Sequence, residues 1–528
     1  MTSCLRALAL AVVSSAWVFG AAQETPWASA MAAGDKAFQE RRYGDAQKLF
    51  SSALQQAEGF GAKDPRLAAT LNNLAQLDQR RGRYQEAETL YRRAVAIWEQ
   101  ARGPQDPELA ASLSNLAELY QQLARYSEAE PLYQRCLAIR QSALPPDDRR
   151  IAVSLSNLGS LYRAQGRYGE AEAIFRQAAT VREKAVGPDH PDMAVPLNNL
   201  ADLYRVESKY AQAEELYRRV LALQEKALGP DDPEVAVGLN NLAELYRIES
   251  RYAEAEPLYR RSLAIREKVF PPGDSRLATG TNNLALLYRA QGRTTDAEIL
   301  FRRALATREQ ALGPDHPDLA TPLNNLAELY RYLHRFGDAE KLYRRALAIR
   351  EKAFGTNHPE YAASLGNLAE LYREEHKYDK ARALQEQSLQ IREKVLGPDH
   401  PAVAGTLNNL AELDFLQKKY GEAEPLYRRA LALREKTLGS EHRAVAFTLN
   451  DLAELYRAQN RYGEAEPLYQ RALAIREKIL GPNHLDVAAT LENYAAMLHA
   501  VGRVNQAKDL EVRAAAIREK AAKPYPTQ

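Results

Sequence analysis

Cysteine is nearly absent from this sequence, which has two among its 528 residues, Cys4 and Cys136. Cys4 lies in an N-terminal segment that we expect to be removed, so the mature chain has no internal disulfide and packing must stabilise it. An excess of one charge is also missing, because 71 Lys and Arg face 69 Asp and Glu. The net charge therefore gives no case for nucleic acid as a partner.

Motifs that carry catalysis are missing as well. The sequence has no glycine-rich phosphate loop, no nucleophile elbow and no isolated pair of acids, so we expect no enzymatic activity and no cofactor. Six histidines recur at one loop position: His190, His316, His358, His400, His442 and His484. No loop adds a cysteine or a second histidine at ligand spacing, so we expect no metal site. Cys136 takes the small position that Ala304 holds in another copy, which predicts an inert core residue.

The N-terminal apolar stretch is too short to span a membrane. It covers residues 7–19, follows Arg6 and is followed by Gly20-Ala21-Ala22, whereas a spanning helix needs about 20 apolar residues. This pattern predicts a secretory signal peptide over residues 1–22, a short linker over 23–28, and an exported protein, periplasmic or secreted, with no membrane span after signal removal. If Met31 is the true start, the protein is cytoplasmic instead.

What the sequence does contain is a repeat. The segment Leu-Asn-Asn-Leu-Ala-Glu-Leu-Tyr at residues 239–246 returns with a period of 42 residues. Its second Asn falls at Asn73, Asn115, Asn157, Asn199, Asn241, Asn283, Asn325, Asn367, Asn409 and Asn493, with Asp451 in the remaining register. With a looser unit before these, the chain is predicted to hold about twelve repeats over residues 29–520, followed by a disordered tail over 521–528.

Each repeat is predicted to form two antiparallel helices, giving an all-α fold. Apolar residues in 239–246 recur at i, i+3, i+4 and i+7, as on one face of a helix. A turn over residues 249–251 follows, and its middle register holds residues that tolerate a left-handed helix end, such as Gly82 and Asn460. The second helix should run from Ala253 to about Val269. Prolines near the start of three second helices, Pro257, Pro425 and Pro467, suggest that those helices begin late.

The small and aromatic positions of the repeat, Ala243, Tyr246, Ala255, Tyr259 and Ser262, resemble those of the tetratricopeptide repeat (TPR). The period and the Gly-Pro-Asp-His-Pro loop at residues 313–317 resemble the kinesin-light-chain type of that repeat. The resemblance implies a right-handed superhelical solenoid whose first helices line a concave, peptide-binding face. The sequence departs from this pattern at six positions. Tyrosine is replaced at Asp78, Asp414 and Leu498, and the turn glycine is replaced at His334, His376 and Lys418. These departures leave the geometry of repeats eight to ten open.

The repeated asparagine is the main candidate for a binding function. At about 100° per residue, Asn241 falls roughly 200° from Leu239 and faces away from the core. Its carboxamide could pair with both the N–H and the C=O of an extended peptide. The candidate peptide-binding residues in this register are Asn73, Asn115, Asn157, Asn199, Asn241, Asn283, Asn325, Asn367 and Asn409. In the alternative, these asparagines bond between neighbouring repeats and brace the solenoid.

Neighbouring registers would supply selectivity. Val195, Val206, Val237 and Ile248 are predicted to form an apolar floor, with Arg205, Arg247 and Arg289 along its edge. The arginines could attract a carboxylate or phosphate; alternatively, Glu244 and Arg247, which are spaced i,i+3, could simply pair with each other. The chain is therefore predicted to be a non-catalytic scaffold that binds an extended peptide or protein segment. The alternative is a structural or oligomerising envelope scaffold that uses its ends and convex face, with self-association.

Overall fold

The structure, a computed structural model, describes residues 25–522, with side chains up to residue 520. The predicted signal peptide and most of the predicted tail lie outside the described residues. Within them the chain forms α-helices joined by short turns, with no strand. The helices are α1 (Pro26–Gln39), α2 (Tyr43–Glu58), α3 (Pro65–Arg80), α4 (Tyr84–Arg102), α5 (Pro107–Gln122), α6 (Tyr126–Ala143), α7 (Arg149–Ala164), α8 (Tyr168–Val186), α9 (Ala194–Val206), α10 (Tyr210–Leu228), α11 (Pro233–Ile248), α12 (Tyr252–Val269), α13 (Ser275–Ala290), α14 (Thr294–Leu312), α15 (Ala320–Tyr332), α16 (Phe336–Phe354), α17 (Pro359–Glu374), α18 (Tyr378–Leu396), α19 (Pro401–Leu416), α20 (Tyr420–Leu438), α21 (Arg443–Ala458), α22 (Tyr462–Leu480), α23 (Leu485–Ala500) and α24 (Val504–Ala522).

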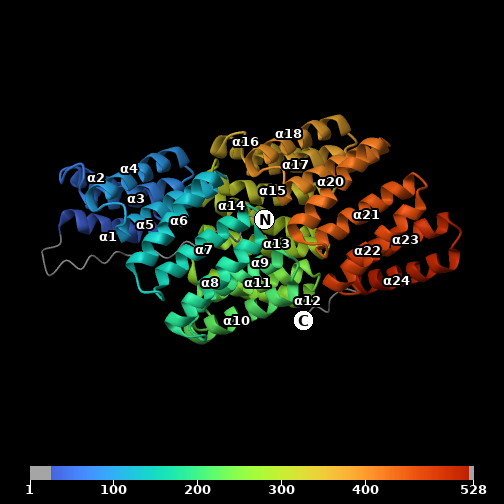
Figure 1. Ribbon diagram of the computed structural model, residues 1–528, viewed down its shortest axis with the longest axis horizontal. Coiled ribbons are helices and arrows are strands. Elements are labelled where there is room, and N and C mark those ends of the chain that lie inside the picture. Colours follow the sequence, from blue (N-terminus) through green and yellow to red (C-terminus); the bar gives the residue numbers. More distant parts are fainter. Residues whose placement is uncertain (1–24, 523–528) are drawn as a thin grey trace. The chain divides into compact units, whose positions relative to one another are not determined.

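Helices that follow one another pair in sequence order, as α1 with α2, α11 with α12 and α23 with α24, which agrees with the predicted all-α fold of about twelve helix pairs. Figure 1 shows this for α21 to α24 at the C-terminal end, where each helix lies beside the next. Short 3-10 turns, Pro191–Met193 and Pro317–Leu319, precede α9 and α15. No helix in the described part of the chain is both long enough and apolar enough to cross a membrane.

Residue type explains where each first helix begins. Asp232 precedes α11, and its carboxylate accepts a hydrogen bond of 2.8 Å from the N–H of Glu234. Pro233 then occupies the first helical position, where no intrahelical N–H partner exists. The same device starts α1, because Thr25 accepts from the N–H of Ala28 and Pro26 follows. Residues 26–28, the last three of the predicted linker, lie in the first turn of α1.

Each of several first helices is followed by a residue with a left-handed backbone conformation, that is, a positive φ. Ser250 has φ 58°, and Gly82 and Asn460 have φ 76° and 59°. His334, His376 and Lys418 adopt the same conformation, with φ between 55° and 60°. The glycine substitutions in repeats eight to ten therefore leave the regular helix end intact, at the modest energetic cost of a left-handed residue with a Cβ.

The prolines of the second helices do not delay the helix start. α12 begins at Tyr252, five residues before Pro257, and Pro425 and Pro467 likewise lie inside α20 and α22. The late start predicted from these prolines is wrong. Pro257 is exposed, so the carbonyl that loses its intrahelical partner can face water. Burial of Ala255 and Tyr259 on the opposite side holds the first turns in place.

The core runs between helix pairs. In one typical cluster, Val235, Ala236 and Leu239 of α11 pack with Ile265 of α12 and with Leu221 of the preceding repeat. Each repeat thus completes its core only with a neighbour, as in other solenoids. The contacts divide the chain into an N-terminal block (up to Ala164, Gly169–Pro196 and Pro314–Pro317) and a C-terminal block (Gln165–Tyr168, Leu197–Gly313 and from Asp318 onward). We describe each block by itself.

Candidate functional site on the first helices

The repeated asparagine lies between successive first helices, which contact one another along both blocks. In the C-terminal block, Nδ2 of Asn283 donates to Oδ1 of Asn240 at 2.9 Å, and Nδ2 of Asn325 donates to Oδ1 of Asn282 at 3.0 Å. Asn241 makes the same bond to Asn198 at 3.4 Å. The second asparagine of one repeat thus bonds to the first asparagine of the repeat before it, which is the bracing arrangement of the alternative prediction.

The N-terminal block uses other acceptors for the same register. Asn73 donates to Oδ1 of Asp35 at 2.6 Å, and Asn157 donates to Oγ of Ser114 at 3.1 Å. The side chains of Asn115, Asn367 and Asn409 are half-buried. These asparagines therefore do not stand free on an open face, as a helical wheel of one isolated helix suggests.

Asn199 differs from the rest of the register. It is fully buried, and neither its Nδ2 nor its Oδ1 has a hydrogen-bond partner in the described structure. A helical wheel places it on the exposed side of its own helix, yet packing against neighbouring elements encloses it. The wheel considers a single helix, so it cannot register burial by other elements of the structure.

The geometry of stacked, capped helix pairs agrees with the comparison of the sequence with known families. Models of the tetratricopeptide repeat match residues 28–97, 66–142, 151–192, 192–268, 276–352, 323–394, 360–436, 402–478 and 445–520. The chain belongs to the tetratricopeptide repeat family. These matches cover most of the sequence and confirm the resemblance read from the repeat.

Solved structures similar to this TPR protein include two that are related to kinesin light chains. BtubC (BKLC) from P. vanneervenii is 26% identical, with 46% of this chain and 94% of that chain covered and a TM-score of 0.36. A putative kinesin light chain from Podosopora anserina, with nearly identical TPR-like repeats, is 26% identical over 39% of this chain and 97% of its own, with a TM-score of 0.33. A Rap protein complexed with Competence and Sporulation Factor is 16% identical, with 71% and 99% covered and a TM-score of 0.46. No curated protein matches the TPR chain.

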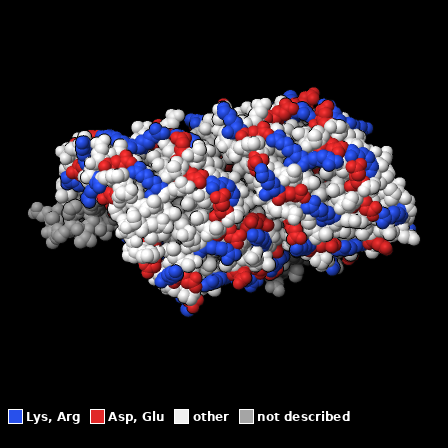
Figure 2. Space-filling view, viewed as in Figure 1, with Lys and Arg blue, Asp and Glu red and all other residues white. Residues whose placement is uncertain are grey.

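The arginine row of the TPR protein is paired with carboxylates. Arg247 forms an ion pair of 2.7 Å with Glu244, three residues earlier on α11. Arg205 lies 3.6 Å from Asp202, and Arg289 lies 2.7 Å from Glu328 of the next repeat. Glu244 and Arg247 thus pair with each other on one helix, whereas Arg289 pairs with a glutamate of the next repeat. Figure 2 shows the same balance more widely, with positive and negative side chains interspersed over the face in view.

The apolar register beside the asparagines is partly open. Val195 is 43% exposed, while Val206, Val237 and Ile248 are half-buried. The register of Val195 and Val237 also contains Phe447 in α21, and its ring is 47% exposed. The sequence analysis missed Phe447, although a large aromatic residue where other repeats carry Ala, Val, Thr or Gly was a visible signal.

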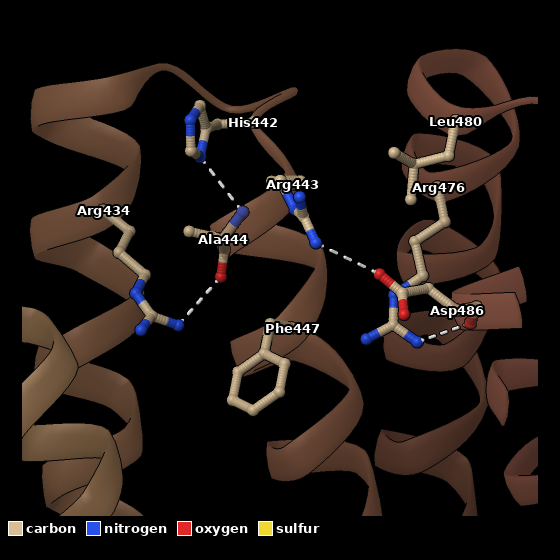
Figure 3. Close-up of a pocket in the computed structure, with 8 residues that line it drawn as sticks. All are labelled: Arg434, His442, Arg443, Ala444, Phe447, Arg476, Leu480 and Asp486. Atoms are coloured by element: carbon tan, nitrogen blue, oxygen red, sulfur yellow. Dashed lines mark hydrogen bonds and ion pairs between the residues drawn. The ribbon is translucent and has the colours of Figure 1, made fainter. Parts of the chain in front are cut away.

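Phe447 lines a small pocket in the C-terminal block, with a volume of about 250 Å³ (Figure 3). Arg434 on α20 and Arg476 on α22 flank the ring, and the guanidinium of Arg434 lies 5.8 Å from the ring centroid. Each guanidinium donates to a backbone carbonyl of the following first helix, Arg434 to Ala444 at 2.9 Å and Arg476 to Asp486 at 2.7 Å. These arginines belong to second helices, so an analysis confined to first helices overlooked them.

The pocket carries excess positive charge. Its third guanidinium, on Arg443, lies 3.4 Å from the carboxylate of Asp486, the single acidic residue in the lining. Burial lowers the pKa of Arg434 to about 10, which reflects a cation with little compensating negative charge. Three guanidinium groups and one aromatic ring can together hold a side chain that is anionic at one end and apolar along its length.

Acidic groups on the same face have raised pKa values. Burial raises the pKa of Glu412 to about 7 and that of Asp451 to about 6, against the lowering effect of nearby arginines. The carboxylate of Asp451 accepts a hydrogen bond from Nδ2 of Asn408 at 2.9 Å. Asp451 thus belongs to the row of side-chain hydrogen bonds between successive first helices, which we call the asparagine ladder. Among the residues described, no group of three or more His, Cys, Asp and Glu side chains could hold a metal ion.

Proposed function

We propose that this TPR protein is a non-catalytic scaffold that binds an extended segment of another protein along the face of its first helices. One observation carries the proposal. An exposed aromatic ring, Phe447, lies on that face beside three guanidinium groups and a single carboxylate, and a monomer gains no stability from leaving such a ring in water. The names of the solved TPR structures, one of which is complexed with a factor, are consistent with this function.

The asparagines contribute to this face in a different way from the one first expected. Where Nδ2 bonds to the neighbouring repeat, as in the half-buried Asn325, the amide oxygen keeps an acceptor position. Such an oxygen could accept an N–H from a bound backbone, while the bracing bond holds it in place. Bracing and binding are then compatible, with the first fixing the geometry for the second.

The test starts from peptides selected on the purified protein from a random library. Phe447→Glu places a charge in the pocket, and Ile299→Glu places the same charge on an exposed second-helix position, since Ile299 is 61% exposed on α14. Fluorescence anisotropy should show affinity for the selected peptides reduced at least about tenfold by Phe447→Glu and unchanged by Ile299→Glu. Peptides that bind both variants as tightly as the natural sequence would rule out this face.

A second function, assembly through the chain's end, is favoured by one feature. Val501, Val504 and Val512 are 39%, 41% and 71% exposed in the last repeat. Such a cluster at a solenoid end can pair with a second copy or with another envelope protein. Sedimentation velocity should then show concentration-dependent association that Val512→Asp abolishes and Phe447→Glu leaves intact. A monomer at all concentrations would exclude self-association.

A further inference from the structure

The residue that caps each first helix changes type along the chain. This register holds Asp64, Asp106, Asp148, His190, Asp232, Asp274, His316, His358, His400, His442 and His484. Aspartate caps by accepting from the N–H two residues on, as Asp232 does at 2.8 Å. His442 makes the equivalent bond with its ring, because Nδ1 accepts from the N–H of Ala444 at 3.0 Å. Capping alone therefore does not explain why the last five positions are all histidine.

The other ring nitrogen provides the explanation. In the C-terminal block, Nε2 of His442 lies 2.9 Å from the carbonyl oxygen of Val206, 236 residues earlier. Nε2 of His484 lies 3.0 Å from Oγ of Ser250, 234 residues earlier. In the N-terminal block, Nε2 of His316 lies 3.0 Å from the carbonyl oxygen of Arg80, again 236 residues earlier. Each contact joins a loop to the end of a first helix between five and six repeats before it.

The chemistry of the ring fits both bonds at once. Because Nδ1 accepts from a backbone N–H, the proton of a neutral ring sits on Nε2, which can then donate to the carbonyl of Val206. An aspartate could make the cap but has no hydrogen to give to a carbonyl. The loops of His316, His442 and His484 contact earlier helix ends, and histidine at these three positions supplies the donor that aspartate lacks.

Glycine and proline at equivalent turns and loops elsewhere in the chain support this kind of contact independently. A Cβ built on Gly166 would lie 2.5 Å from Cδ of Pro401 within the C-terminal block, and one built on Gly82 would lie 2.9 Å from Cδ of Pro317 within the N-terminal block. At these two turns a side chain would collide with the loop. The helix ends are thus shaped for close approach of a much later loop.

We propose that His442 and His484 form an acid-sensitive latch that fastens their loops to the ends of α9 and α11 and that opens when the rings are protonated. A proton added to Nδ1 would face the backbone N–H that Nδ1 now accepts, so the cap and the orientation of the ring are lost together. The loop then loses the hydrogen bonds through which the ring attaches it to the earlier helix end. The latch is intramolecular, and His442 also lines the Phe447 pocket of the proposed binding face.

The groups around His442 keep the ring neutral at neutral pH. Burial is the largest influence on the pKa of His442 and lowers it; the hydrogen bond to the Val206 carbonyl raises this pKa by less, and the charges of Arg443 and Arg434 lower it. In the turn after α9, which faces His442, Glu207 and Lys209 form an ion pair with each other. The hydroxyl of Tyr210, at the start of α10, accepts a hydrogen bond from Arg443 at 3.3 Å.

His484 has a similar setting with one opposing charge. Burial lowers its pKa, and Arg443 and Arg476 act in the same direction, while Asp486 at 3.9 Å raises it. The facing turn after α11 contributes an ion pair of 3.2 Å between Glu249 and Arg251, and Tyr252 beside Ser250. A histidine with a folded pKa below its unfolded value stabilises the closed form above pH of about 6.5, and this stabilisation is lost as pH falls below that value.

The test measures the distance across the latch. Nitroxide labels at Ala211→Cys and Ser440→Cys, both exposed positions in the C-terminal block, leave the buried Cys136 unlabelled. Electron–electron double resonance should give a narrow, short distance distribution at pH about 7.5 and a broad, longer one at about 5, with unchanged helical circular dichroism.

Two variants separate the latch from general acid sensitivity. His442→Asp with His484→Asp retains the caps but removes both donors, so the long distribution is expected at both pH values. His190→Asp is the matched control. Nδ1 of His190 accepts from the N–H of Asp192 at 3.1 Å, so the residue is a cap, and its side chain is 44% exposed. This variant should therefore give the same distance distributions as the natural protein. If the double variant does not fold, His442→Asp alone is measured in the same way. A distance that ignores pH in the natural protein, or a short distance in the aspartate variant, would overturn the latch.

Discussion

At the residue scale, the repeated asparagine was found from the sequence, but its bonding partner was not. Its register follows from the 42-residue period and needs no structure. The partner of Asn283 is Asn240, 43 residues earlier, and this pairing depends on how closely successive first helices approach. A one-helix wheel contains no such information, so the choice between a braced and an open asparagine required the packing.

Asp451 is the residue whose titration has the clearest consequence. Burial raises its pKa to about 6, so the folded chain loses stability as pH rises from the unfolded pKa near 4 through about 6. Asp451→Asn keeps an acceptor for Asn408 and removes the buried charge. The variant should be more stable than the natural protein by about 1–3 kcal/mol at pH about 7.5, with no gain below about 4.

Urea denaturation at several pH values measures this difference. Asp399→Asn is the control, because Asp399 is an exposed loop carboxylate, and its effect should stay within about 0.5 kcal/mol. An Asp451→Asn gain that does not depend on pH would contradict a titration-based explanation.

At the element scale, helix number, order and left-handed ends could all be predicted from periodicity and turn residues. The prolines of the second helices were misread, because a proline five residues inside a helix normally suggests a boundary. Pro257 is tolerated since it is exposed and the opposite side of α12 is anchored in the core. The arginines of the pocket were missed for a related reason. They lie on second helices and reach the starts of the following first helices.

The asparagine ladder can be tested at this scale by replacing Asn241, Asn283 and Asn325 together with alanine. Alanine is the better helix former, yet each change removes a bond to the preceding repeat worth about 0.5–1.5 kcal/mol. The melting temperature of the triple variant should therefore be lower than that of the natural protein.

Asn409→Ala is the matched control, because the residue 43 positions earlier is Gly366, which offers no side-chain acceptor. The melting temperature of Asn409→Ala should equal that of the natural protein. If the triple variant melts early but binds its selected peptides normally, the asparagines only brace the solenoid. If it melts normally but loses binding, they hold the ligand.

At the scale of the whole molecule, local contacts predict uneven stability. A terminal repeat has one neighbour instead of two, so α23 and α24 should open first and the middle repeats last. Hydrogen exchange read by mass spectrometry should show amides of α24 exchanging well before those of α11 and α12. Deleting residues from 481 onward should expose the apolar side of α22 and promote aggregation while the middle stays helical. Simultaneous exchange along the whole chain would contradict this expectation.

Export is a second prediction at this scale. We propose that residues 1–22 are a signal peptide and that the mature chain begins near Gln23, directly after Gly20-Ala21-Ala22. Intact-mass analysis of the protein recovered from the exported fraction of its native host measures this start. Recovery of an intact Met1, or a start at Met31, in a cytoplasmic fraction would refute export.

The spacing of the loop contacts also limits how such a chain can change in length. His442 meets Val206 over 236 residues, and every repeat presents the same helix end and loop at 42-residue intervals. If one whole repeat between them were lost, the loop of His442 would meet the equivalent helix end of the adjacent repeat, and the contact would re-form. An insertion of a few residues in any intervening turn has no such remedy, because it displaces every later loop from its docking position. We therefore expect a change in length by whole repeats to preserve these contacts.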